Sequence, residues 1–287
     1  MVIQNEVSAL IALLDDDDFE VVESVADRLL FWGEEALPLL EQELFNMNQT
    51  QYDKIDLLIG KIRLQTIKST FLNWKKSESK SLLQGILLLN KLGYHELDEE
   101  KVMQTLHELK LKVWLELNDD LTSFEKVKIL NHMLYSVFQL KPNSTFYHHP
   151  DNSYLNKVLA LKTGNPISLS IVYIIIAEML DIPIKGVNVP QHFMLAYVDE
   201  NETLRHDTDI LFYINAFDNG VIFSHAHVGQ YIESLGLLPK EEFMEPCSNV
   251  DILIRCCRNL IYSYELLQNK EKVTSLNEIL AILEEAD

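Results

Sequence analysis

Cysteine is scarce in this chain. Its three cysteines, Cys247, Cys256 and Cys257, lie near the end of a sequence of 287 residues, and two of them are adjacent. An odd number of cysteines without any C-x-x-C spacing excludes a disulfide framework and a zinc ribbon. Free thiols are typical of a reducing compartment, so the sequence predicts a cytoplasmic protein.

Basic residues are also few. Lysine and arginine total 24 against 44 aspartates and glutamates, which gives a formal net charge of -20. A surface of that sign repels the phosphates of nucleic acids and of anionic membranes. The composition therefore argues against a nucleic-acid partner and favours a protein or peptide partner, for which a basic surface would be complementary.

Long hydrophobic runs and glycine-rich loops are missing. The longest apolar stretch, residues 167–180, is interrupted by Ser168, Ser170 and Glu178, and it is shorter than the roughly 20 residues that cross a bilayer. The first residues carry no basic region, unlike a signal peptide. We expect no membrane span, and without a phosphate-binding loop or a metal-ligand cluster we expect no cofactor and no metal.

Helical periodicity dominates the first half of the sequence. Apolar residues at a 3.6-residue period predict three helices within residues 1–45, the second ended by Gly33. This pattern resembles one HEAT-type repeat, which must stack on further helices because it cannot bury its apolar face alone. A helical region of residues 46–141, predicted to lie on the core, follows with helices at 51–74, 80–92, 98–117 and 123–139. Thr122 and Glu125 have capping-box spacing at the start of the last one.

After Pro142 the predicted secondary structure is no longer helical throughout, and helices and strands both occur. A short helix at 153–162 precedes Asn165 and Pro166, which suit the N-cap and first position of a helix that is apolar nearly all round and therefore buried. Alternating segments separated by turn residues predict an antiparallel sheet. These segments are 185–189, 193–198, 203–205, 211–216 and 221–223. The fold class is therefore α+β, with a core of residues 142–249 and a helical hairpin at 250–287.

Three residues of this core could form a catalytic triad. Papain-like and transglutaminase-like enzymes place a nucleophile in the first turn of a buried helix, a histidine base on a following strand, and an aspartate or asparagine on the next strand. Ser168, His192 and Asn215 occur here in that order. A serine is harder to deprotonate than a thiol, and an asparagine gives the imidazolium no counter-charge. The alternative is that Ser168 caps its helix and His192 is a half-buried packing residue.

Three blocks of the core resemble a known family. They are Asn152-Ser153-Tyr154-Leu155, Gly164-Asn165-Pro166-Ile167-Ser168-Leu169-Ser170 and Gly186-Val187-Asn188-Val189-Pro190-Gln191-His192-Phe193. Their combination is similar to the SirB-type, transglutaminase-like family of bacterial proteins. The resemblance implies a papain/transglutaminase-like core, a helical region before it, and a tetratricopeptide-like tail within residues 250–287.

The resemblance also shows what this sequence lacks. An ungapped match puts Pro166 at the position of the catalytic cysteine of true transglutaminases, and Ser168 matches only with a short gap. His192 matches the family histidine, whereas Asn215 replaces the family's aspartate. Asn152, Asn165, Pro166 and Gln191 are the candidate binding residues within the matching blocks.

Two histidine pairs complete the set of candidates. His225 and His227 alternate as two metal ligands on one face of a strand would, but no third ligand is evident, and exposed loop histidines are the simpler interpretation. His148 and His149 lie in a loop near Asn152 and could line the site.

These observations favour a transglutaminase-like protein without the catalytic cysteine. The leading hypothesis is a non-catalytic module that binds a protein or peptide through its core and its repeat-type helical flanks. The alternative is a serine- and histidine-dependent hydrolase or acyl transferase that acts on an amide or ester. A third hypothesis is a structural subunit in which side chains fill the space around His192.

Overall fold

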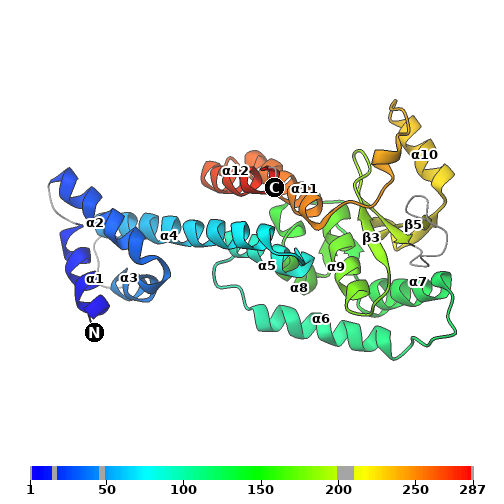
Figure 1. Ribbon diagram of the computed structural model, residues 1–287, viewed down its shortest axis with the longest axis horizontal. Helices are drawn as coiled ribbons and strands as arrows, with labels where there is room; N and C mark the ends of the chain where they lie inside the picture. The colour runs from blue at the N-terminus through cyan, green and yellow to red at the C-terminus, as the bar shows by residue number, and fades with distance from the viewer. Residues whose placement is uncertain (1, 15–17, 45–48, 199–209, 286–287) are drawn as a thin grey trace. The chain divides into compact units, whose positions relative to one another are not determined.

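The structure is a computed structural model that describes residues 2–14, 18–44, 49–198 and 210–285 (Figure 1). The chain divides into two compact units, Met1–Asn73 and Trp74–Asp287. All strands of the described residues belong to the second unit. The finer division at residues 45, 141 and 249 stays a prediction.

The first unit is a helical cluster with its own core. It contains α1 (Val2–Leu13), α2 (Phe19–Trp32), α3 (Leu37–Glu43) and most of α4 (Gln49–Lys76). Gly33 ends α2 as predicted, with a φ of 55° that few other residues tolerate. The buried residues come from all four helices and the segments beside them: Val7, Ile11, Leu14, Val25, Leu29, Ala36, Leu40, Ile55, Leu58, Ile59 and Ile62.

Three helices open the second unit: α5 (Leu82–Gly93), α6 (Glu99–Trp114) and α7 (Ser123–Asn131). The predicted capping box of Thr122 and Glu125 is present at the start of α7. The predicted helix 123–139 is present to Val137, but beyond Asn131 it widens from an α-helix into the π-helix η3 (His132–Val137). Asn131 donates a hydrogen bond to Gly220 O at 2.8 Å and accepts one from Tyr173 Oη at 3.0 Å, tertiary contacts that periodicity does not reveal.

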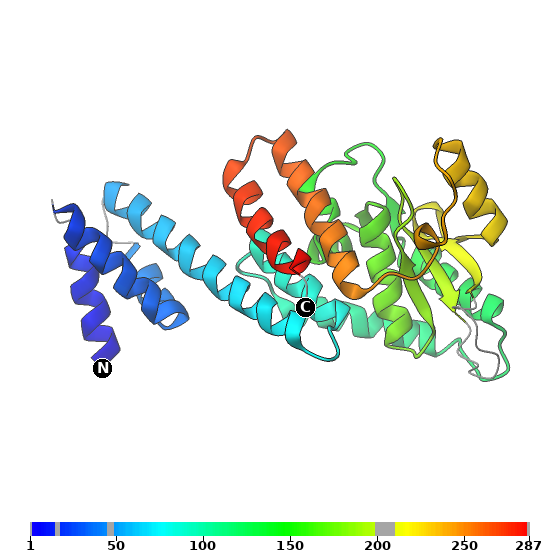
Figure 2. The same ribbon diagram turned by 45° about the horizontal axis from the view of Figure 1, so that its top comes forward.

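Helix α9 (Pro166–Glu178) is the central helix of the second unit. Every residue from Pro166 to Ala177 is buried. The helix contacts the strands β3 (Ile184–Val187) and β4 (Met194–Val198) and the helices α5, α6, α8 (Leu155–Leu161) and α11 (Asn249–Leu266). The two views in Figures 1 and 2 show it beside the sheet. Surrounded in this way, α9 has no face that needs polar residues, which explains its uniformly apolar sequence.

The sheet has the antiparallel order β3-β4-β5-β6. Its strands are β3 (Ile184–Val187), β4 (Met194–Val198), β5 (Ile210–Asn215) and β6 (Val221–Phe223), and a short parallel pair, β1 (Lys141–Pro142) with β2 (Thr163–Gly164), precedes α9. The predicted strand 203–205 lies outside the described residues. Leu195 pairs with Ile214, so the turn before β4 and the end of β5 meet at one edge of the sheet.

The end of the chain is helical. The hairpin of α11 (Asn249–Leu266) and α12 (Lys270–Glu284) is present as predicted, and the α+β class is confirmed. Helix α10 (His225–Ser234) was not predicted, because it has only 10 residues and buries only Val228 and Ile232. The prediction that His225 and His227 lie in a loop is therefore wrong, since both belong to the first turn of α10.

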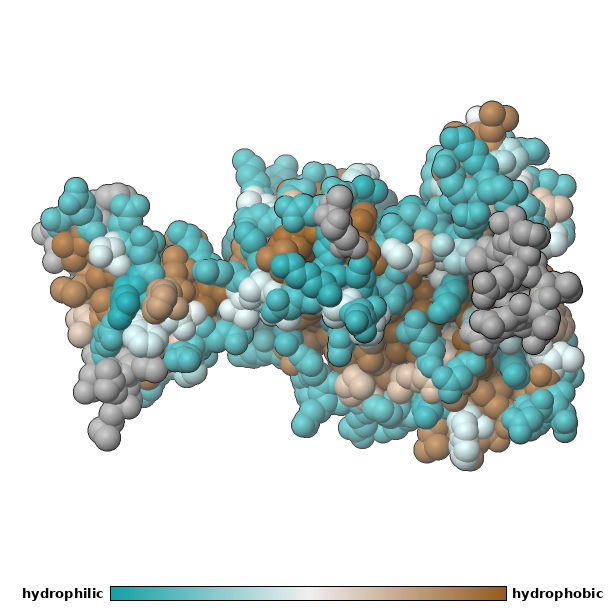
Figure 3. All heavy atoms as spheres, in the orientation of Figure 1, coloured by the Kyte–Doolittle hydropathy of each residue, from teal (hydrophilic) through white to brown (hydrophobic). Residues whose placement is uncertain are grey.

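The visible surface in Figure 3 is largely hydrophilic, with hydrophobic residues in smaller groups between. This agrees with a chain in which acidic residues outnumber basic ones by 44 to 24. Within the described ranges, no helix combines the length and the apolar character that crossing a bilayer requires.

Candidate functional site

Ser168 lies in the first turn of α9 and is buried, with 3% of its surface exposed. Its Oγ accepts a hydrogen bond from Asn165 N at 3.0 Å and donates one to Asn165 O at 3.2 Å. In return, Asn165 Oδ1 accepts from Ser168 N at 3.0 Å, which completes a capping box. Within the described residues, the hydroxyl therefore makes its hydrogen bonds to the N-cap residue of its own helix and none to His192.

The polar groups of Asn152 and Asn165 are also engaged by their neighbours. Asn165 Nδ2 donates to Ser153 Oγ at 2.8 Å. Asn152 Nδ2 donates to Phe146 O at 2.6 Å and to Tyr147 O at 3.1 Å. Both asparagines are buried, so they support the loop before α8 and the start of α9. Pro166 is buried at the first position of α9, and Gln191 is exposed in the turn before β4.

His192 and Asn215 are brought together by the sheet edge. His192 lies in the turn between β3 and β4, Asn215 ends β5, and His192 Nε2 lies 3.1 Å from Asn215 Oδ1. The same Oδ1 accepts the N–H of Phe217 at 3.0 Å, which fixes the amide with its oxygen toward the histidine. His192 Nε2 must then be the donor, and the lone pair of the neutral ring is on Nδ1.

The environment of His192 disfavours the protonated form of its ring. Burial of the ring lowers the pKa of His192, and the positive charge of Arg255 lowers it further, while the hydrogen bond to Asn215 acts in the opposite direction. A neutral imidazole with a free Nδ1 can accept a proton or a hydrogen bond. The pair therefore has the geometry of a base with its orienting residue, and within the described part of the chain no hydroxyl or thiol is hydrogen-bonded to the ring.

Side chains from distant parts of the chain surround this pair. The ring of Tyr231, on α10, lies 6.1 Å from the His192 ring, and the Tyr147 ring lies 6.1 Å from that of Phe217, beside Asn215. Arg255, on α11, donates a hydrogen bond from Nη1 to Asn188 Oδ1 at 2.8 Å. Sequence reasoning missed these residues, although Tyr147 directly precedes the predicted His148–His149 loop.

The thiols of the chain are not activated. Burial raises the pKa of Cys256 well above its usual value and raises those of Cys247 and Cys257 to about 12. Nucleophilic cysteines need a lowered pKa because the thiolate is the reactive form. None of the three cysteines has the character of a displaced catalytic nucleophile.

In each of the two predicted histidine pairs, one histidine contacts a neighbouring side chain. His227 Nδ1 lies 2.8 Å from Ser224 Oγ at the start of α10, where the two residues form a capping box. His148 lies between two tyrosines, with ring centroids 4.9 Å from Tyr147 and 4.9 Å from Tyr262. His148 thus links the 143–149 loop to α11.

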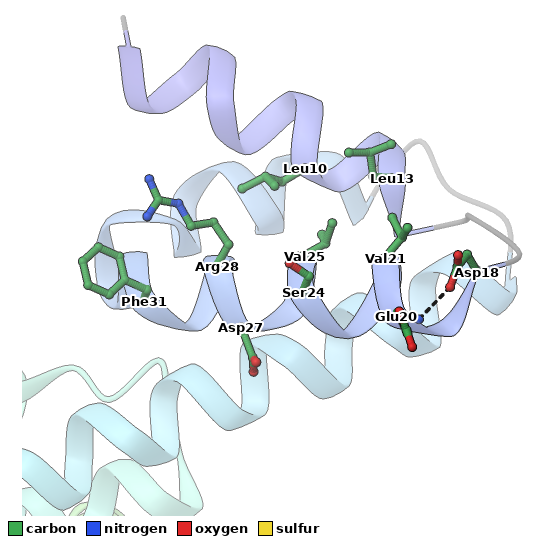
Figure 4. Close-up of a pocket in the computed structure, with 10 residues that line it drawn as sticks. All are labelled: Leu10, Leu13, Asp18, Glu20, Val21, Ser24, Val25, Asp27, Arg28 and Phe31. Atoms are coloured by element: carbon green, nitrogen blue, oxygen red, sulfur yellow. Dashed lines mark hydrogen bonds between the residues drawn. The ribbon is translucent and has the colours of Figure 1, made fainter.

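The first unit has a separate surface groove of about 750 Å³ between α1 and α2 (Figure 4). Its lining includes the apolar side chains of Leu10, Leu13, Val21 and Val25 and the acidic residues Asp18, Glu20 and Asp27. The one basic side chain in the lining, Arg28, is paired with Glu6 at 2.8 Å and lies against Phe31. The lining of the groove therefore combines apolar and acidic side chains.

Comparisons with known proteins add the following. The family model described as the transglutaminase-like superfamily matches residues 100–258. F-box only protein 21 is 36% identical in Mus musculus and 37% in Homo sapiens over 91 residues, which are 32% of this chain and 14% of either relative. A UPF0162 protein from Xylella fastidiosa (strain 9a5c) is 30% identical over 141 residues, 47% of each protein. These matches span less than half of each relative, and no solved structure matches significantly.

Proposed function

The chain belongs to the transglutaminase-like superfamily, and we propose that it is a non-catalytic member that binds a protein or peptide. One observation supports this most strongly: the hydroxyl of Ser168, the candidate nucleophile, is buried and hydrogen-bonded to Asn165 through both its donor and its acceptor function. A hydroxyl held in this way has no free orientation toward a base. In this proposal the His192–Asn215 pair contacts the ligand, because it presents an imidazole at a partly exposed sheet edge.

The surroundings of His192 suit a peptide ligand. Tyr147 and Tyr262 expose 39% and 49% of their surface, and Tyr231 is half-buried. Tyrosine is enriched at the centres of protein interfaces because it combines a large apolar ring with a polar end. We define the binding surface of this proposal as Tyr147, His148, His192, Tyr231 and Tyr262.

A peptide-display experiment tests this function. Panning a random-peptide phage library on the full chain should enrich peptides that lose about tenfold or more in affinity on Tyr147→Ala, as truncation of an interface tyrosine typically costs. Tyr52→Ala is the matched control, since Tyr52 lies on α4 in the first unit and exposes 41% of its surface. Enrichment of no peptide would refute the proposal, and equal effects of the two substitutions would refute binding at this surface.

The groove of the first unit is the second surface of this proposal, and its partner is a basic amphipathic segment. Three acidic residues of its lining, Asp18, Glu20 and Asp27, complement basic side chains, and the apolar residues of the lining accept the other face of the segment. Binding there should weaken as salt rises and on Phe31→Ala, since Phe31 exposes 75% of its surface. Salt-independent binding would mean that the acidic residues of the groove take no part in binding the basic segment.

The second candidate function is a serine- and histidine-dependent hydrolase or acyl transferase. It is favoured by the 3.1 Å contact of His192 with Asn215, which leaves Nδ1 free as a base. This function requires a rearrangement that releases Ser168 from its cap. It predicts that a fluorophosphonate probe labels Ser168 and that His192→Ala abolishes the labelling. Absence of labelling in a folded chain excludes it.

Two finer assignments belong to this proposal. We assign the chain to the SirB-type branch of the superfamily with a tetratricopeptide-like tail, on the support of the three sequence blocks and the α11–α12 hairpin. We also propose that it acts in the cytoplasm, in accord with its three free cysteines.

A further inference from the structure

Arg255 differs from the other described arginines in its partners. Arg28, Arg63 and Arg258 each form an ion pair with a glutamate, with N–O distances of 2.8, 2.6 and 2.7 Å. Arg255 is half-buried, and among the described residues its hydrogen bond goes to the neutral amide oxygen of Asn188 at 2.8 Å. In a chain with 44 acidic residues, a half-buried guanidinium without a carboxylate partner is unusual.

The nearest acidic residue on the same helix is already engaged. Asp251, one turn before Arg255 on α11, accepts hydrogen bonds from Ser248 N at 2.9 Å and from Ser248 Oγ at 2.6 Å. These bonds form the capping box of α11. Arg255 therefore retains donor N–H groups beyond the one used for Asn188, because a guanidinium has five.

The guanidinium lies at the binding surface defined above. Its Nη1 bonds Asn188, which lies in the same β3–β4 connection as His192, and the His192 ring lies 6.1 Å from that of Tyr231. In accord with this position, the pKa of His192 is lowered by burial and further by the positive charge of Arg255. Tyr262 follows Arg255 by seven residues and so lies on the same face of α11, where it contacts His148. Residues from the 143–149 loop, the turn before β4, α10 and α11 thus meet around one arginine.

We propose that Arg255 binds the carboxylate of a peptide ligand, while Tyr147 and Tyr231 contact the neighbouring side chain of that peptide. This inference rests on the proposed peptide-binding function and names the group that is recognised. A guanidinium pairs with a carboxylate through two parallel hydrogen bonds, and the hydroxyls of the two tyrosines can donate further bonds.

A carboxylate fits this site better than a phosphate. Phosphorylated peptides are typically recognised by clusters of arginines, whereas the described residues place one arginine here. The net charge of -20 also disfavours a dianion more than a monoanion. Asn188 and Asn215 contribute neutral amides, so the charge of one carboxylate would be matched by the charge of one guanidinium.

The test uses small probes and the full chain, so it does not depend on finding a natural peptide. The side-chain Nε–H resonances of the arginines are followed by NMR during titration with N-acetylphenylalanine or with its amide, N-acetylphenylalaninamide, at constant ionic strength. We expect a saturable shift of the Arg255 resonance with the acid and an affinity about ten- to a hundredfold lower with the amide. Arg258, three residues further on α11 and paired with Glu284, is the internal control.

Further arms separate the sources of the anion. N-acetylaspartic acid amide presents a side-chain carboxylate, so comparison with N-acetylphenylalanine distinguishes an acidic side chain from a chain terminus. Equal binding of acid and amide, equal shifts of Arg255 and Arg258, or tighter binding of inorganic phosphate than of either acid would overturn the inference.

Variants of the arginines give a second test. The Arg255→Gln variant should lose the preference for the acid over the amide, Arg255→Lys should keep part of this preference, and Arg258→Gln should bind both probes as the wild type does. Peptides from the display experiment that lose affinity on Tyr147→Ala but not on Arg255→Gln would refute the carboxylate site and leave the peptide-binding function intact.

Discussion

The orientation of the His192 ring depends on one amide oxygen. Asn215 Oδ1 accepts the Phe217 N–H at 3.0 Å and the His192 Nε2–H at 3.1 Å. The residue was predicted as a neutral substitute for an aspartate, and the structure places it where such a carboxylate would act. An asparagine can orient an imidazole, but it provides no negative charge for the protonated ring.

Restoring that charge should change the titration of the histidine. In Asn215→Asp, we expect the pKa of His192 to rise, because a carboxylate next to the ring favours the imidazolium. Phe217 N can still donate to a carboxylate oxygen, so the local fold should be kept. NMR titration of the His192 ring in both proteins measures the difference. An unchanged pKa would mean that residue 215 does not face the ring in solution.

The lowered pKa of His192 makes stability depend on pH in a defined direction. In the folded state the pKa is below the usual 6.5, so the unfolded chain binds more protons at acidic pH. The stability contributed by the neutral buried ring is complete above pH 6.5 or so and is lost as the pH falls below it. Urea unfolding at pH 7 and pH 5 should show a smaller loss for His192→Gln than for the wild type.

The matched control for this measurement is His107→Gln, which removes an exposed histidine on α6. It should lose as much stability between the two pH values as the wild type does. If His192→Gln also follows the wild type, another group accounts for the acid sensitivity.

At the scale of the element, the start of α9 illustrates how one sequence pattern can carry two interpretations. Asn165-Pro166-Ile167-Ser168 is a capping sequence, and it is also a block in the region where the family's enzymes carry their nucleophile. The structure realises the cap: Asn165 and Ser168 bond reciprocally, and Asn165 Nδ2 bonds Ser153. A buried cap contributes more to the free energy of unfolding than an exposed one, because the backbone groups that it hydrogen-bonds have no access to water.

We therefore expect Asn165→Ala to destabilise the protein by about 2–4 kcal/mol, the sum of a lost cap and of buried polar groups left without partners. Asn269→Ala is the matched control, since Asn269 is an exposed N-cap that accepts from Lys272 N at 3.0 Å. Its removal should cost about 1 kcal/mol. Chemical denaturation of both variants gives the comparison, and equal losses would show that burial of the α9 cap contributes nothing.

At the scale of the whole molecule, the chain consists of two compact units, each with apolar side chains buried within it. Leu29 is fully buried in the first unit, and Leu253, on α11, is fully buried in the second. Units with separate cores can unfold in separate steps, in which case one unfolding free energy does not describe the chain.

Core truncations should therefore act on one unit at a time. We expect Leu29→Ala to destabilise the first unit by about 2–5 kcal/mol, and Leu253→Ala to do the same in the second, through lost burial and the cavities left behind. Hydrogen exchange measured by mass spectrometry should show faster exchange only in the unit that carries the substitution. Faster exchange in both units with either variant would show that they unfold together.

The sequence by itself determined the elements whose signals are local. The uniformly apolar α9, the caps at Thr122 and Asn165, the glycine that ends α2, and the order Ser168–His192–Asn215 all depend on residues a few positions apart or on element order. Capping hydrogen bonds and the spacing of apolar side chains depend on residues within a few positions of one another, so the rest of the chain does not change these signals. The α+β class was predicted from the change between helical spacing and strand-like alternation of the apolar residues. The transglutaminase-like core was predicted from three short sequence blocks.

Only the tertiary structure decided what those residues do. It engaged the Ser168 hydroxyl with Asn165, bonded His192 to Asn215, and brought Tyr147, Tyr231 and Arg255 to the residues around this pair through ring contacts and a hydrogen bond. Those three residues are separated by tens of positions: Tyr147 lies in a loop, whereas Tyr231 and Arg255 lie on helices that bury apolar side chains of their own. Their meeting results from the packing of the 143–149 loop, α10 and α11 around the sheet edge, and no local periodicity encodes such a contact.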